Sequence, residues 1–228
     1  MKNDEKHPYN PAHSWLPLLT LIRNDEISKQ EAIEKMKNII HDINDYLSDK
    51  NVAYHSKDNW VFPVKGYSPS AIGGVNGSGY YPADFDFFDL STGGHPAHDI
   101  FIYDYNQDIL DDVTNDPVSI LSMSGGVVVE TRKNWTSEMM YIKGGNIVYV
   151  YDDFTEGFFY YAHLDKVFVN VGDFVEPGMV LGTMGRSGKN ANPSRSPTHL
   201  HIMYVKSYDG DLQSVDLYND LLNAKLIP

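Results

Sequence analysis

Hydrophobic positions recur with one period at the start of the chain and with another in the rest. Between Trp15 and about Leu47, apolar residues are spaced three or four apart, which predicts amphipathic helix. The segment Ser28-Lys29-Gln30-Glu31 has the pattern of a capping box, the signature of a helix N-terminus. The polar positions of this helix mix both signs of charge, so we expect its apolar stripe to dock on the protein and not on a lipid surface.

After Lys50 the pattern changes to short runs of Val, Ile, Phe and Tyr separated by Gly, Pro, Asn and Asp. Such punctuation is typical of strands and turns. The sequence therefore predicts a mainly β protein, α+β overall, with an N-terminal helical arm at residues 1–50 and a second domain at residues 51–228. The predicted strands are Asp99–Tyr103, Gly126–Thr131, Ile147–Tyr151, Phe158–His163 and Leu200–Val205.

Two connections between these elements have a predicted form. Ile147–Tyr151 and Phe158–His163 should form a hairpin with a six-residue connection, residues 152–157. The stretch Tyr67–Gly94 is rich in Gly, Ser, Tyr and Asp and lacks alternation, so we expect a long loop there. Loops of that length are often functional.

The charge of the chain limits its partners. Its 228 residues include 18 lysines and arginines against 31 aspartates and glutamates, a formal net charge of −13. A nucleic-acid-binding surface needs clustered positive charge, so we expect no nucleic-acid partner. The chain contains no cysteine, so disulfides and thiolate metal ligands are excluded and any metal site must use nitrogen and oxygen.

The N-terminus, MKNDEKHPYNPAH, lacks a basic region followed by an apolar one, and no stretch approaches the ~18 apolar residues of a membrane span. The sequence is thus expected to be either a processed or re-engineered form or a cytoplasmic protein, and we predict no membrane span.

Five of the nine histidines fall in three short motifs, which are His95-Pro96-Ala97-His98-Asp99, Tyr161-Ala162-His163-Leu164 and Thr198-His199-Leu200-His201. Because side chains alternate faces in a strand, His199 and His201 should point the same way. The pair His95 and Asp99, preceded by two glycines, suits a turn that enters a strand.

These motifs together suit zinc chemistry. A catalytic zinc takes three nitrogen or oxygen ligands and leaves one position for water, and an unligated imidazole can carry protons near neutral pH. Each motif alone is weak: a His-Leu-His is more often cross-strand packing than a ligand pair, and His163 could be a half-buried histidine bonded to a carbonyl.

The set of motifs, in this order, resembles the lysostaphin-type zinc metallopeptidases, a family of peptidoglycan endopeptidases. The resemblance spans roughly residues 60–205 and includes the glycine-punctuated stretch that runs from Gly172 to Gly188. It implies a largely antiparallel β core with a metal-bearing groove. It also implies one Zn²⁺ per chain held by His95, Asp99 and His201, with His163 and His199 as the catalytic histidines.

The resemblance further implies hydrolysis of peptide bonds in the stem or cross-bridge of peptidoglycan, and a place in the bacterial cell envelope, either periplasmic or extracellular. The alternative is a catalytically inactive member of the same fold that regulates a cell-wall hydrolase or acts as a binding module. No oligomeric state is predicted.

Three features depart from the family pattern. Ala97 stands where the family usually has glycine, which is tolerable if its backbone angle is ordinary and strained if φ is positive. His98 should point away from Asp99, as a residue supporting the ligands or lying at the surface. The segments Tyr103–Asp116 and Lys189–Pro197 are expected to form walls of the groove. The first begins like a calcium loop, but Ile109 takes the place of the required glycine, so calcium is not expected.

Overall fold

The computed structural model describes residues 9–89 and 93–228, so the start of the predicted arm and part of the predicted loop before Gly94 lie outside the described residues. The N-terminal region forms a short 3₁₀ turn at Pro11–Ser14 and two helices, α1 at Trp15–Arg23 and α2 at Lys29–Asp49. The capping box is confirmed, because the Ser28 side chain accepts from the Glu31 N–H and the Glu31 side chain accepts from the Ser28 N–H.

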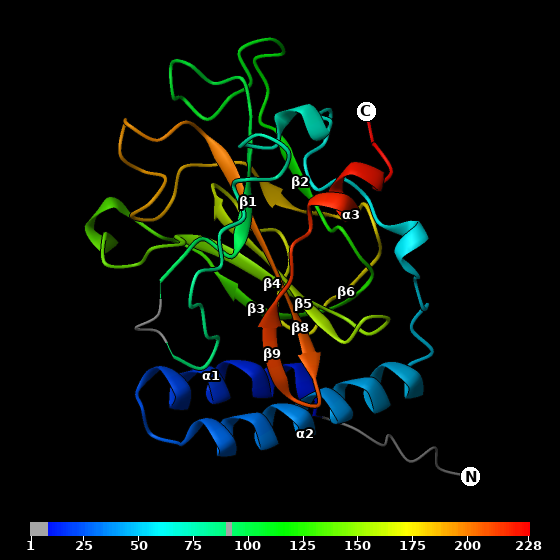
Figure 1. Ribbon diagram of the computed structural model, residues 1–228. Coiled ribbons are helices and arrows are strands. Elements are labelled where there is room, and N and C mark those ends of the chain that lie inside the picture. The colour runs from blue at the N-terminus through cyan, green and yellow to red at the C-terminus, as the bar shows by residue number, and fades with distance from the viewer. Residues whose placement is uncertain (1–8, 90–92) are drawn as a thin grey trace.

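The rest of the chain is built on antiparallel sheet, so the predicted fold class is confirmed. The main sheet has the strand order β1-β8-β5-β4-β3-β6, with β9 paired to β8. These strands are β1 Ala97–Phe101, β3 Gly126–Arg132, β4 Asn146–Asp152, β5 Gly157–Leu164, β6 Phe174–Val175, β8 His199–Tyr208 and β9 Asp211–Ser214. A small second sheet pairs β2 Ser119–Leu121 with β7 Val180–Thr183, and α3 at Tyr218–Asn223 lies near the C-terminus (Figure 1).

Each predicted strand is present, with shifted ends. β1 starts and ends two residues earlier than predicted, at Ala97 and Phe101. The β4–β5 hairpin is tighter than predicted, because Asp152 pairs with Gly157 and only residues 153–156 connect the strands. The buried Asp152 carboxylate accepts from the Thr155 hydroxyl at 2.5 Å, which closes this turn. The spacing of hydrophobic residues does not reveal this side-chain contact, so it could not predict the shorter connection.

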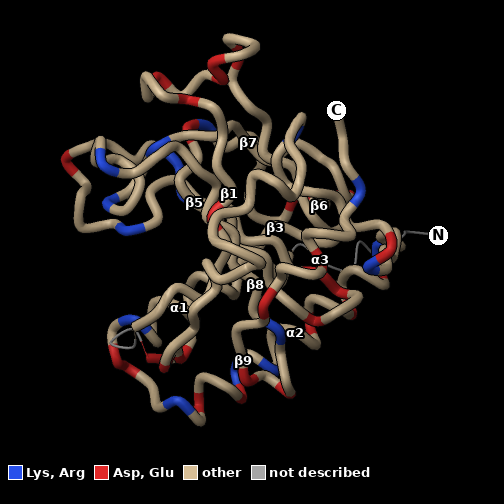
Figure 2. Tube along the Cα trace, turned by 45° about the horizontal axis from the view of Figure 1, so that its top comes forward, with Lys and Arg blue, Asp and Glu red and all other residues tan. Residues whose placement is uncertain are grey.

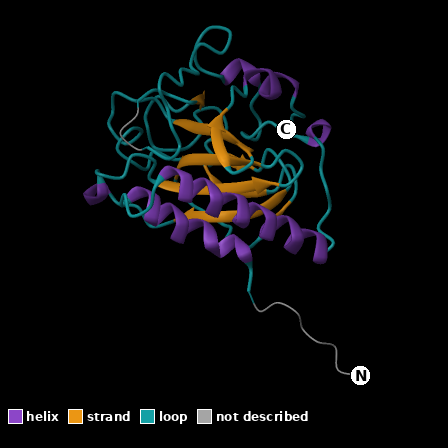
Figure 3. Cartoon of the chain, turned by 60° about the horizontal axis from the view of Figure 1, so that its bottom comes forward, coloured by secondary structure: helices purple, strands orange, loops and turns teal. Residues whose placement is uncertain are grey.

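The two faces of the main sheet are covered differently. α1 and α2 lie side by side across one face (Figure 3). Trp15 is fully buried there, stacked on Phe158 at 4.3 Å between ring centroids and bonded through its indole N–H to Glu130 at 3.1 Å. The arm therefore shares its core with the sheet, and the division of the chain at residue 50 stays a prediction.

The opposite face is covered by the small sheet, the segment around Trp60 and α3. Both faces being buried explains why β4 is buried at all seven positions and reads as a near-continuous apolar run. None of the helices in the described part of the chain combines the length and the apolar character needed to cross a bilayer. Acidic positions are spread over the whole trace (Figure 2), as the net charge suggests.

Candidate metal centre

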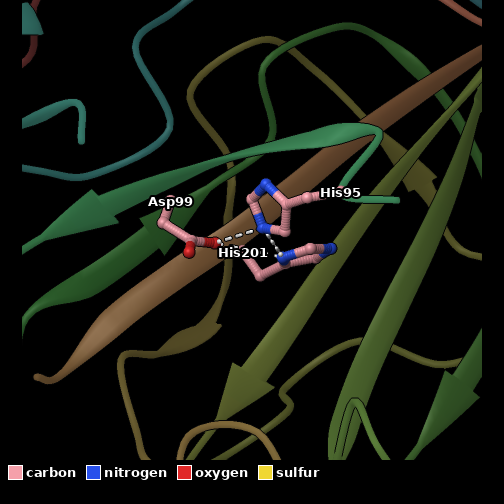
Figure 4. Close-up of side chains that lie close together, drawn as sticks. All are labelled: His95, Asp99 and His201. Carbon is pink, nitrogen blue, oxygen red and sulfur yellow. Dashed lines mark hydrogen bonds and ion pairs between the residues drawn. The ribbon is translucent and has the colours of Figure 1, made fainter. Parts of the chain in front are cut away.

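Three side chains from separate places in the sequence meet on the face of the main sheet that α1 and α2 cover. They lie on a part of that face that the helices leave open. Asp99 on β1 pairs directly with His201 on β8, so their side chains leave the sheet on the same side. His95 joins them from the turn before β1 (Figure 4). Asp99 Oδ1 lies 3.2 Å from His95 Nε2 and 3.0 Å from His201 Nδ1, and the two nitrogens are 3.2 Å apart.

This triangle suits a zinc ion. Ligands held about 2.0–2.2 Å from a tetrahedral zinc lie about 3.3–3.6 Å from one another, so small side-chain shifts would complete the geometry. Two imidazoles and one carboxylate are a ligand set that zinc accepts. The three side chains stay 19–35% exposed, which leaves room for water at a fourth position. Among the described residues, no other trio of histidine, aspartate or glutamate ligand atoms gathers within 4.8 Å.

The long loop before β1 fixes the orientation of His95. The Nδ1 atom of His95 lies 2.8 Å from the Gly79 carbonyl oxygen, and the backbones of His95 and Tyr81 form a bridge. A carbonyl acceptor on Nδ1 places the proton there and leaves Nε2 free to face Asp99 and His201. Metal-binding histidines usually carry such an outer hydrogen bond.

The charges within the trio stabilise one another. Burial opposes ionisation of Asp99, but hydrogen bonds from His201 and His95 overcome it and hold the pKa of this carboxyl well below its usual range. The hydrogen bond to Asp99 in turn raises the pKa of His95. Without an ion these side chains form a hydrogen-bonded cluster around a carboxylate that stays ionised.

His163 reaches the same place through an irregular strand. The register of β4 and β5 shifts here, because Asn146 pairs with Leu164 while Ile147 pairs with Ala162, and His163 is left as the extra residue. Its φ of 69° is unusual for a residue other than glycine. Such a bulge re-aims a side chain. The His163 ring thereby lies 5.8 Å from the His201 ring and 4.9 Å from the His199 ring.

The two histidines outside the trio are oriented alike. His163 Nδ1 lies 2.8 Å from the Ser187 carbonyl oxygen, and His199 Nδ1 lies 2.8 Å from that of Pro197. In both rings the Nδ1 proton is thus engaged and Nε2 is left for other chemistry. The Nε2 atom of His199 lies 3.7 Å from Asp99 Oδ1.

Both of these histidines are buried and stay neutral near pH 7. Burial, reinforced by the neighbouring His201 and His199, lowers the pKa of His163 to about 3. Burial also lowers the pKa of His199. The structure thus brings all five histidine and aspartate side chains of the sequence prediction together, while their division into ligands and proton carriers stays a prediction.

Comparison with known proteins gives the family. Residues 110–215 match peptidase family M23. This part of the chain is therefore a peptidase M23 domain. The matched residues include His163, His199 and His201, while His95 and Asp99 precede them and are brought to the site by the fold.

Solved structures with a similar chain path include three peptidases. A putative glycyl-glycine endopeptidase LytM from Ruminococcus gnavus shares 22% identity over 97% of this chain and 86% of its own, with a TM-score of 0.48. The catalytic domain of lysostaphin from Staphylococcus simulans shares 25% identity over 63% and 86%, with a TM-score of 0.41. A zinc-containing peptidase from Vibrio cholerae shares 18% identity over 74% and 40%, with a TM-score of 0.42. No curated protein matches the sequence significantly.

The two departures beside the site of this M23 protein are accommodated by β1. Ala97 has no positive φ and its methyl group is buried, so alanine is unstrained here. His98 points to the opposite face, as expected, where its Nε2 lies 2.8 Å from Asp216 Oδ1 and its ring packs between Tyr80 and Tyr218. Its side chain is 1% exposed, so the surface position considered for His98 is wrong, and its direction keeps it away from the trio.

Several parts of this M23 site carry no signal in the sequence. The backbone carbonyls of Gly79, Ser187 and Pro197 orient three of the histidines, and any residue type supplies a carbonyl. Tyr160 packs edge-on to His201 at 6.0 Å between centroids, and alternation along β5 from Ala162 could have placed it on that face.

Proposed function

We propose that this chain is a zinc-dependent endopeptidase that hydrolyses peptide bonds in the stem or cross-bridge of bacterial peptidoglycan, in the cell envelope. The convergence of five side chains from three separated motifs carries this proposal. His95, Asp99 and His201 would hold one Zn²⁺ per chain, and His163 and His199 would serve as the catalytic histidines. The match of residues 110–215 to peptidase family M23 supports a peptidase, and the oxygen and nitrogen ligand set supports zinc.

The trio is suited to holding the metal because its three ligand atoms already lie within 3.2 Å of one another. When bound, zinc would act as a Lewis acid that lowers the pKa of a coordinated water toward neutrality. Asp99 stays ionised and is held between two imidazoles, so its carboxylate is available as a ligand.

The neutral imidazoles of His163 and His199 are suited to moving protons. Each holds its Nδ1 proton against a backbone carbonyl, so Nε2 accepts a proton from the attacking water or passes one to the leaving amine. An imidazole that gains a proton also stabilises the negative oxygen of the tetrahedral adduct. Which of the two takes each part follows from the position of the substrate.

The alternative of an inactive member with a regulatory or binding role has less support. Inactive relatives of an enzyme usually lack ligands or catalytic groups, and here the full set of five is present and assembled. A shared fold alone does not establish activity, so this alternative is an outcome of the experiment below.

The test measures metal content together with hydrolysis. The purified chain is loaded with zinc, and new amino groups are counted after incubation with isolated sacculi from several cell-wall types and with defined muropeptides. We expect one zinc per chain and release of amino groups that a chelator abolishes. A fully zinc-loaded protein that cleaves none of these substrates would favour the inactive member.

A further inference from the structure

A large cavity, of about 1310 Å³, lies at the Phe101 end of β1. It is bordered by the segments 65–72, 103–116 and 194–197. Two residues of its lining also touch the site, because the ring of Phe101 lies 5.4 Å from that of His199 and the Pro197 carbonyl accepts from His199. A molecule in this cavity would therefore extend up to a proposed catalytic histidine.

The cavity walls are tied together by hydrogen bonds. The Thr198 hydroxyl donates to the buried Asp104 carboxylate at 2.6 Å, and the Gln107 amide donates to the Ser194 carbonyl at 2.8 Å. The Arg186 guanidinium donates to the Ser196 carbonyl at 2.7 Å. The first two bonds join the loop 103–116 at the top of Figure 1 to the orange loop beside it, and the third fixes the orange loop to the segment around Arg186. The cavity is preformed, as binding sites for small ligands usually are.

Two exposed tyrosines stand on one wall, and the ring of Tyr103 packs on one side against that of Tyr67, at 5.9 Å between centroids. Tyr103 and Tyr105 are 55% and 85% exposed, and both line the cavity. The loop 103–116, which carries both tyrosines, is anchored by Tyr67. The Tyr67 hydroxyl accepts from the Tyr103 N–H at 2.9 Å and donates to Asp111. Large aromatic side chains left exposed on an anchored wall offer apolar faces to a ligand.

The remaining lining combines apolar side chains, among them Ile72, Val113 and Leu226, with polar ones. Hydroxyl and amide groups come from Ser68, Ser70, Gln107, Thr114 and Ser194. Aromatic faces combined with hydroxyl and amide groups fit a sugar ring, which has an apolar C–H face and an edge of hydroxyl and acetamido groups. The charged lining residues are of both signs, with Lys65 and Arg195 against Asp116 and the buried, hydrogen-bonded Asp104 and Asp111, so no single sign of charge selects an ionic ligand.

This cavity is less suited to binding an extended peptide. An extended peptide gains affinity by pairing its backbone with a free strand edge. The outer edge of β1 is already in use here, since the Gly73 N–H donates to the Asp99 carbonyl at 2.8 Å and Ile72 bridges to Ile100. The lining therefore favours a saccharide over a second stretch of peptide.

We propose that this cavity binds a neutral N-acetylated sugar unit of a glycan strand while the attached peptide lies over the metal centre. This proposal rests on the proposed function, because peptidoglycan joins glycan and peptide in one substrate. It predicts that the chain distinguishes peptides still attached to glycan from free peptides.

The direct test is binding of a chitin tetrasaccharide, a β-1,4-linked oligomer of N-acetylglucosamine, to the full chain by calorimetric titration. We expect Tyr105→Ala and Tyr103→Ala each to weaken binding about fivefold or more, since one aromatic stacking contact accounts for about that factor. Tyr105→Phe keeps the ring and should bind within about twofold of the unaltered chain. The matched control is Tyr208→Ala, a 52% exposed tyrosine at the opposite end of β8 from Pro197, which should bind unchanged.

Absence of tetrasaccharide binding, or an equal loss in Tyr208→Ala, overturns the proposal. A second measurement compares hydrolysis of muropeptides with that of the same peptides freed of sugar. We expect Tyr105→Ala to raise KM for the glycan-linked substrate alone, and an equal rise for the free peptide would make the cavity a peptide site and overturn the proposal. If the chain binds the sugar through these tyrosines but cleaves none of the substrates, the proposed sugar site is supported and the proposed peptidase activity is wrong.

Discussion

Asp99 and Asp152 are carboxylates of the same sheet in opposite environments. Asp99 lies in the metal centre, where nitrogens of two imidazoles lie 3.0 and 3.2 Å from one of its oxygens and keep its pKa below the usual range. Asp152 lies at the β4–β5 connection, where the Thr155 hydroxyl and the Phe154 N–H donate to it, but burial outweighs these bonds and raises its pKa to about 7. Burial of an acidic residue therefore does not by itself keep it ionised, whereas partners that favour the charged form do.

The histidines of the centre differ in the same way. The hydrogen bond from His95 to the carboxylate of Asp99 raises the pKa of His95. His163 faces a carbonyl and other histidines, and burial lowers its pKa to about 3. Contact with the carboxylate thus distinguishes His95, a proposed ligand, from His163, one of the two proposed proton carriers.

The comparison is tested most severely by removing a ligand. His201→Ala takes away one of three ligand atoms, so we expect loss of bound zinc and a fall in hydrolysis of about a thousandfold or more. Zinc content by mass spectrometry of the native protein and amino-group release from sacculi measure both effects. The exposed His41→Ala on α2 is the control and should keep both. Retention of zinc by His201→Ala would contradict its place among the ligands.

Removing a proton carrier should separate metal binding from catalysis. In His163→Ala we expect zinc to stay bound while hydrolysis falls by about 10²–10⁴-fold, the usual contribution of a general acid or base. Because His163 has a φ of 69°, His163→Asn is a second variant that tolerates this backbone conformation better than alanine. Equal loss of zinc in His163 and His201 variants would show that the assignment of roles is wrong.

Asp152 should make stability depend on pH. Its pKa of about 7 in the folded chain lies above the ordinary value of 3.8, so the unfolded chain releases this proton first as pH rises. The contribution of Asp152 to the free energy of unfolding therefore falls between about pH 4 and pH 7 and is constant above that.

Asp152→Asn removes this penalty, so we expect it to stabilise the protein by about 1–3 kcal/mol at pH 8, given about 1.4 kcal/mol for each tenfold difference in proton affinity, and by much less at pH 4. Urea unfolding of both chains at the two pH values measures the difference. Asp45→Asn, on the exposed side of α2, should show no comparable gain. Destabilisation by Asp152→Asn at pH 8 would mean that the ionised carboxylate is favoured where it lies.

The smallest effect is expected beside the ligands. Ala97→Gly introduces the residue usual in the family, but the backbone at Ala97 is ordinary and its methyl group is buried. We expect a loss of about 0.5–1 kcal/mol in unfolding free energy from the added freedom of the unfolded chain, with zinc content and hydrolysis unchanged. A gain in zinc affinity would show that alanine strains this turn.

Much of this architecture follows from local patterns in the sequence. The capping box at Ser28 correctly predicted the start of α2. Each predicted strand is present, because the strand preference of β-branched and aromatic residues acts within a short run of sequence. Strand ends were less accurate, as at Asp152, where a buried side-chain bond extended β4 beyond its hydrophobic run.

Alternation of side chains along β8 correctly placed His199 and His201 on one face, and the same rule turned His98 away from Asp99. That rule alone would misplace His163, which follows Ala162 and should face the opposite side. The bulge against β4 reverses its direction, and a bulge depends on the register of two strands that hydrophobic spacing does not specify.

The sequence by itself determined the residue types of the site, their order and the secondary structure around them, because these depend on local periodicity and on the chemistry of imidazole and carboxylate groups. Only the tertiary structure decided that β1 lies beside β8, which distances separate the ligand atoms, and which carbonyl orients each ring. Those features come from pairing between segments about 100 residues apart in sequence, such as Asp99 with His201. The stability of this strand pairing depends on contacts across the whole sheet, so no single segment of the sequence encodes these features.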